Sequence, residues 1–125
     1  MSNMNEAPSL VFEALRILDR WKVANDEQLS LLTLPTDMHP RMLKRLRQGD
    51  GQLQEDHEML NRIRYVFEIN RSLQTMFPHN GEMADYWVTT PNLQLQEQRP
   101  LDVMLAHGCE GMQTVSQQLN GTCDW

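Results

Sequence analysis

Residues 57–78, "HEMLNRIRYVFEINRSLQTMFP", carry the strongest helical pattern in the chain and decide its fold class. Gln54, Asp56 and Glu58 suit the first turns of a helix, and Pro78 ends the run. We therefore predict one long amphipathic helix, whose apolar stripe must be covered by other elements. The stripe has Asn70 within it and consists of Met59, Leu60, Ile63, Val66, Phe67, Leu73 and Phe77.

Three shorter helical patterns precede this segment. The first opens at Pro8 or Ser9, and its apolar residues Leu10, Val11, Ala14, Leu15, Leu18 and Trp21 recur at helical spacing. The second runs from Asn25 to Leu34, with Asn25 or Asp26 as its N-cap. The third has Pro40 in its first turn and Gly49 as its C-cap. Its apolar face holds Met42, Leu43 and Leu46.

The downstream part also reads as helical. A short helix over residues 81–88 is expected to bury Met83 or Tyr86 with Trp87. A loop leads to a helix that starts at Pro100, and a final amphipathic helix uses Met112, Val115 and Leu119 and stops at Asn120-Gly121. Only a weak alternation at Leu93 and Leu95 hints at a strand. The predicted fold class is all-α.

Size and charge limit the function. A chain of 125 residues that is 40% hydrophobic is one domain, or two small helical lobes with a common core. The net charge of −6 is uneven: residues 41–71 hold seven basic and five acidic residues, whereas residues 72–125 hold six acids and only Arg99. Such a protein is not a general nucleic-acid binder, because that affinity scales with the phosphates neutralised. A protein partner or a local DNA contact fits better.

Targeting signals are missing from the sequence. The start, "MSNMNEAPSL", has neither a basic segment nor an apolar one, and no apolar run approaches the roughly 18 residues of a membrane span. We expect residues 1–9 to be disordered and the protein to be soluble and cytoplasmic, without a membrane partner. Cys109 and Cys123 are then reduced thiols.

Catalytic and metal-binding patterns are also missing. His39, His57, His79 and His107 are scattered singly, and no spacing completes a metal site. His107 and Cys109 flank a glycine, but neighbours at a helix end do not face one another as a nucleophile and its base must. Glycine-rich phosphate loops are absent as well. The expectation is a protein that is not an enzyme and has no cofactor and no metal.

Read in order, these pieces resemble the Xre/MbcA/ParS antitoxin family over residues 12–125. "EALRILDRWKVANDEQLSLLTLP", "RMLKRLRQG" and "HEMLNRIRYVFEINRSLQTMFP" resemble its Xre-like helix-turn-helix half, here residues 10–77. "MFPHNGEMADYWVTTPN", "RPLDVML" and "GMQTVSQQLNGTCDW" resemble its toxin-binding domain, here residues 78–125.

The resemblance implies the antitoxin of a bacterial type II toxin-antitoxin system. Such a protein binds a cognate toxin, typically a RES-type enzyme that consumes NAD, and covers its active site. Family members commonly form homodimers, and the helix-turn-helix can repress the operon by binding operator DNA. The implied toxin-binding residues are Trp87, Asn92, Arg99, Asp102, Asn120 and Trp125.

An alternative is a DNA-binding transcriptional regulator whose C-terminal half is a dimerisation module. DNA contacts would come from Arg41, Lys44, Arg45 and Arg47 on the third helix. The family's pattern departs here, since Thr33 replaces the usual glycine, Leu46 the usual tryptophan, and the turn is longer. A solvated helix face would explain the basic cluster equally well.

Trp125 ends the chain in "QQLNGTCDW", where a polar residue is usual. Two interpretations stay open. The indole packs on its own domain, or it is presented to a partner, because tryptophan is enriched among interface hot spots.

Overall fold

A computed structural model describes residues 10–49 and 56–123, with side chains described as far as Asn120. Over these residues the fold is all-α, as predicted, with one isolated β-bridge between Asn92 and Gln98. The predictions for residues 1–9 and for Trp125 lie outside the described residues. In order, the helices are α1 (Leu10–Arg20), α2 (Asn25–Leu31), α3 (Pro40–Arg47), α4 (His57–Met76), α5 (Gly81–Trp87) and α6 (Pro100–Cys123), with a 3₁₀ turn η1 (Leu93–Leu95) before α6.

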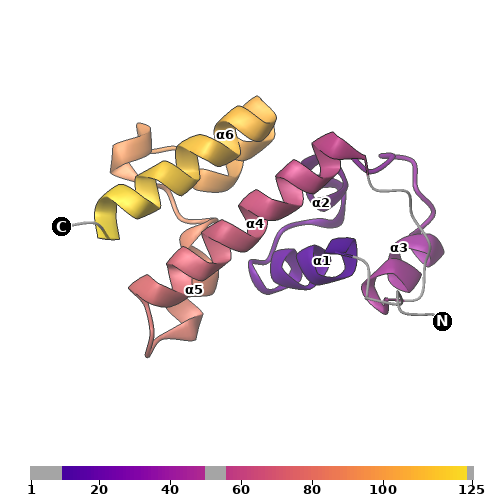
Figure 1. The fold of residues 1–125 in the computed structure, drawn as a ribbon, viewed down its shortest axis with the longest axis horizontal. Helices are drawn as coiled ribbons and strands as arrows, with labels where there is room; N and C mark the ends of the chain where they lie inside the picture. Colours follow the sequence, from indigo (N-terminus) through magenta and orange to yellow (C-terminus); the bar gives the residue numbers. More distant parts are fainter. Residues whose placement is uncertain (1–9, 50–55, 124–125) are drawn as a thin grey trace.

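Helix α4 is the axis of the molecule and crosses it diagonally, between α1 and α6 (Figure 1). The side chain of Asp56 caps it by accepting a hydrogen bond from the Met59 amide at 2.8 Å. The predicted stripe is correct for most positions but wrong at Leu60, which is 36% exposed, and it omits the fully buried Ile69. Helices α1 and α6 cover a face of α4 that is narrower than the predicted stripe. The buried residues of this face are Met59, Ile63, Val66, Ile69 and Leu73.

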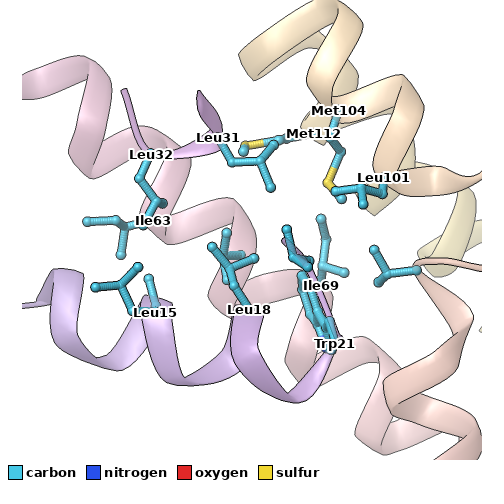
Figure 2. Close-up of a cluster of buried hydrophobic side chains, with 14 of the residues drawn as sticks. Leu15, Leu18, Trp21, Leu31, Leu32, Ile63, Ile69, Leu101, Met104 and Met112 are labelled. Carbon is cyan, nitrogen blue, oxygen red and sulfur yellow. The ribbon is translucent and has the colours of Figure 1, made fainter. Parts of the chain in front are cut away.

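One apolar core joins the predicted N-terminal and C-terminal units. Figure 2 shows Leu18 of α1, Leu31 of α2, Ile69 of α4 and Met112 of α6 pointing toward one another. The boundary at residues 77 and 78 falls just after α4, but α2 and α4 both contact α6 across it. The two units therefore share a core, and the boundary itself stays a prediction.

Helix α2 differs from its predicted bounds. Its N-cap is Ala24 rather than Asn25 or Asp26, and it ends at Leu31 rather than Leu34. The early end has a backbone cause, because Thr33 has a positive φ of 57° and cannot continue a right-handed helix.

Helix α3 ends at Arg47 with Gln48 as its C-cap, one residue before the predicted Gly49, which follows with a φ of 76° where glycine is favoured. His39 caps its start, since its Nδ1 accepts a hydrogen bond from the Arg41 amide at 3.0 Å. Leu43 and Leu46 are buried, but the prediction for Met42 was wrong because this side chain is 40% exposed. Only one side of this short helix packs on α1.

The C-terminal elements correct two further predictions. Met83 and Tyr86 are 49% and 48% exposed, because α5 buries Ala84 instead, followed by Val88. The last helix does not stop at Asn120-Gly121 but continues to Cys123. The two helices predicted after residue 100 are joined in α6, where Gly108 has a φ of 61° and kinks the helix. None of the described helices is long and apolar enough to cross a membrane.

Candidate partner-binding surface

Helix α5 starts the candidate surface and presents apolar side chains to solvent. Asn80 caps it, and its Oδ1 accepts a hydrogen bond from the Met83 amide at 3.1 Å. Trp87 is half-buried and packs against the core, whereas Met83 and Tyr86 face outward. The Leu101 amide donates to the Val88 carbonyl at 3.0 Å and so ties the end of α5 to the start of α6.

The loop between α5 and α6 is a compact, hydrogen-bonded turn. The Asn92 amide donates to the Gln98 carbonyl at 3.1 Å, and the Glu97 amide donates to the Asn92 carbonyl at 2.8 Å. The Asn92 side chain also caps η1 by accepting from the Gln94 amide at 2.8 Å. Gln96 and Glu97 close the turn with positive φ values of 59° and 64°. The turn has a fixed shape although it lacks glycine.

Arg99 and Asp102 form a two-pronged ion pair at the start of α6. The Arg99 Nη2 and Nε atoms lie 2.7 Å and 3.0 Å from the two carboxylate oxygens of Asp102. The hydrogen bond from Arg99 lowers the pKa of Asp102, and the same bond raises the pKa of Arg99. Both side chains are therefore charged and mutually neutralised, and they fix the junction between the loop and α6.

The second half of α6 has a polar groove beside it. Ser72 on α4 donates to the Asn120 side-chain oxygen at 3.1 Å. The groove has a volume of about 460 Å³ and lies between α4 and the end of α6. Its lining residues are Glu68, Arg71, Ser72, Thr75 and Asn120.

The structure brings together some of the predicted toxin-binding residues. Trp87, Asn92, Arg99 and Asp102 all belong to the hydrogen-bonded stretch from the end of α5 to the first turn of α6. Asn120 instead faces α4 through its bond with Ser72. The predicted set therefore divides into a loop group, which consists of Trp87, Asn92, Arg99 and Asp102, and Asn120, which lies against α4. Trp125 lies outside the described residues.

Sequence reasoning missed one prominent residue of this surface. Leu93 is 81% exposed on η1, whereas Leu95 two positions later is only 8% exposed. The weak alternation of these two leucines was the available signal, but it hinted at a strand, whereas the segment forms a 3₁₀ turn. Gln118 on α6 donates to the Gln94 side-chain oxygen, so the turn is braced against the last helix.

The basic helix α3 lies in the other half of the molecule. Arg41, Lys44 and Arg45 are exposed there, and a small groove of about 240 Å³ adjoins His39, Arg41, Met42 and Arg45. Arg47 differs, because its side chain is only 24% exposed and its Nε lies 3.1 Å from a carboxylate oxygen of Asp19.

The contacts of Arg47 explain why Gln28, a polar residue of α2, is fully buried. Arg47 Nη2 donates to Gln28 Oε1 at 3.0 Å and to Asn25 Oδ1 at 2.6 Å. Gln28 Nε2 in turn donates to Asp19 at 2.8 Å and to the Val23 carbonyl at 2.9 Å. Arg47 therefore holds α1, α2 and α3 together.

The group around Cys109 does not resemble an activated nucleophile. Its thiol donates to a Glu58 carboxylate oxygen at 3.4 Å, and burial together with that carboxylate raises the pKa of Cys109. The hydrogen bond from Arg62, at 2.8 Å, lowers the pKa of Glu58. A reactive cysteine needs a lowered pKa. Across residues 10–49 and 56–123, no group of three or more His, Cys, Asp or Glu residues could hold a metal ion.

Comparison with protein families identifies the half that carries this surface. Residues 72–122 match the family model described as the antitoxin Xre/MbcA/ParS C-terminal toxin-binding domain. This range contains the end of α4, α5, η1 and most of α6. No curated protein and no solved structure matches the chain. The matched description names an antitoxin and a toxin partner, which suggests a role other than catalysis.

Proposed function

We propose, from the match of residues 72–122 to an antitoxin toxin-binding domain, that the chain neutralises a cognate RES-type, NAD-consuming toxin by covering its active site. The system would be bacterial and of type II. Contacts to the toxin would come from the loop group, Asn120 and the tail that ends in Trp125. The observation that carries this proposal is the match over residues 72–122, on a surface that presents exposed apolar and acidic side chains.

Charge supports a basic partner. Glu82, Glu97 and Glu110 are exposed on this half, and Arg99 is the only basic residue after position 71. Arg99 is paired with Asp102. The matched segment therefore contains no other arginine or lysine that could neutralise Glu82, Glu97 and Glu110. An enzyme that binds the phosphates of NAD needs a positive pocket, and an acidic domain complements such a pocket.

Co-expression with the product of the adjacent gene tests the proposal. We expect the full chain to relieve the toxicity of that product and a chain lacking residues 120–125 to lose this effect. Met42→Ala, which changes an exposed side chain on α3, is the matched control and should rescue growth fully. Full rescue by the truncated chain would exclude occlusion by the tail.

Operator binding is the second candidate function, and the exposed basic face of α3 favours it. Arg41, Lys44 and Arg45 can reach DNA phosphates or guanine edges. Arg47 is left out of this interface because its contacts lie within the domain. A gel shift on the gene's own promoter should weaken with Arg41→Ala plus Arg45→Ala and persist with Arg16→Ala, a change on α1. Unchanged binding by the double variant would reject this interface.

The chain is also proposed to form a homodimer, which would present two copies of the toxin-binding surface and two copies of the DNA-binding face. An apolar groove of about 530 Å³ between α1 and α4, with Leu10, Leu60 and Phe67 in its lining, supports such an association. Light scattering on the purified chain should give twice the 14.6 kDa of one chain. A strictly monomeric mass at high concentration would exclude the dimer.

A further inference from the structure

Leu93 stands out among the exposed apolar side chains of the described residues. It is 81% exposed, whereas the next most exposed large apolar residue, Met83, is 49% exposed. Single exposed leucines are common on protein surfaces, so exposure by itself indicates little. The structure of the turn that carries Leu93 supplies an independent reason to assign it a role.

The turn holds Leu93 in a fixed position. Asn92 caps η1 through the Gln94 amide and also pairs with Gln98 across the base of the turn. Leu95 anchors η1 in the core, and two non-glycine residues accept positive φ values to close it. Backbone strain of this kind persists where the surroundings enforce it, and it clusters at binding sites. A rigid turn also loses little conformational entropy when a partner binds.

The turn lies at the end of the molecule where the chain leaves α6. The hydrogen bond from Gln118 to Gln94 places η1 beside the last turns of α6. In Figure 1 the segment before α6 and the C-terminal end of α6 lie at the same end of the molecule. A partner that contacts the last described turns of α6 would therefore also meet Leu93.

We propose that Leu93, which lies within the matched residues 72–122, is an anchor side chain for the toxin and inserts into an apolar pocket on it. This inference rests on the proposed function and deepens it. The rim of the pocket should be basic or rich in hydrogen-bond donors, because the exposed residues Gln96, Glu97 and Gln98 follow the anchor in the same turn. An apolar centre within a polar rim is the usual anatomy of a binding hot spot.

The affinity of the purified chain for the adjacent gene's product tests this anchor. Leu93→Ala should weaken binding about tenfold or more, as truncation of a hot-spot side chain does. Leu93→Gln should weaken it similarly, since the pocket then receives a polar group. Met42→Ala, which shortens an exposed apolar side chain on α3, is the matched control and should bind as tightly as the wild type. Because Leu93 makes little contact with its own chain, the melting temperature should stay unchanged in both Leu93 variants.

Asn92 tests whether the rigidity of the turn matters. Asn92→Ala removes the side-chain oxygen that caps η1 and should weaken binding, whereas Asn92→Asp keeps that acceptor and should restore it. Equal affinity of the wild type, Leu93→Ala and Leu93→Gln would overturn the anchor while leaving the antitoxin function intact. A wild-type chain that fails to bind the neighbouring product at all would overturn both.

Discussion

Gly111 is the residue at which a single added methyl group should harm the fold most. It is buried in the second half of α6, directly against the first half of the same kinked helix. A Cβ atom there would lie 2.2 Å from the Val103 carbonyl oxygen and 3.0 Å from the Met104 Cα. Both are backbone atoms, so they cannot rotate away as a flexible side chain can.

The cost of Gly111→Ala follows from these distances. The Val103 oxygen would have to retreat by about 1 Å to regain an ordinary contact distance, in an interior that is already close-packed. Overpacking of this kind costs about 1–3 kcal/mol, and a clash with backbone belongs near the upper end. The better helix propensity of alanine returns at most about 1 kcal/mol. We expect a net loss of about 2 kcal/mol in the free energy of unfolding.

Thermal and urea unfolding, followed by circular dichroism, measure this loss. For a domain of this size, about 2 kcal/mol should lower the melting temperature by roughly 6–10 °C. Gly81→Ala is the matched control, because an added Cβ there meets nothing within 4 Å, and it should leave stability unchanged or slightly higher. A Gly111→Ala variant as stable as the wild type would refute the close approach of the two halves of α6.

Three further predictions concern stability. Thr33→Gly should raise the free energy of unfolding by about 0.5–1 kcal/mol in urea titrations, because Thr33 has a positive φ of 57°; a loss would show that the strain is absent. Gln28→Ala should lower the free energy of unfolding by about 1–3 kcal/mol in the same assay, because the Arg47 guanidinium and the Val23 carbonyl each lose a hydrogen-bond partner. An unchanged free energy would mean that these hydrogen bonds do not stabilise the fold. Asp102 has a lowered pKa in the folded chain, so its pairing with Arg99 stabilises above the ordinary value of 3.8 and is lost as the pH falls below it. Asp102→Asn should therefore flatten the acid dependence of stability between about pH 5 and pH 2, and an unchanged dependence would contradict the pairing.

The long helix and the core could be predicted from the sequence, because helical periodicity reports burial directly. Ile63, Val66 and Leu73 are buried as expected. Periodicity predicts which face of α4 is buried but not how wide that face is. Leu60 was therefore wrongly included in the buried stripe, and Ile69 was overlooked. In a helix of seven residues such as α5, the pattern is too short to choose between Met83 and Ala84.

The helix ends were harder to predict, because tertiary contacts override local signals there. Asn120-Gly121 is a good stop signal, yet the helix continues, since Leu119 is buried and Asn120 is bonded to Ser72 on α4. Thr33 is a poor stop signal, yet it ends α2 with a left-handed backbone.

The candidate surface could be predicted only in part. The resemblance pointed to Arg99 and Asp102, but their mutual ion pair involves atoms that only the fold brings together. The same holds for Arg47, which the sequence assigned to a wet basic face and the structure places against Gln28. Leu93 carried a weak periodic signal, and its value became visible only with the turn that holds it.

An assay of NAD consumption by the adjacent gene's product tests the proposed function most directly. The rate of this consumption should be measured with the purified product while the full chain is added in increasing amounts. We predict that NAD consumption falls to background when the two proteins reach a fixed stoichiometric ratio, and that Leu93→Ala requires a higher concentration for the same effect. Undiminished NAD consumption at a large excess of the full chain would contradict the claim that this protein occludes a toxin's active site.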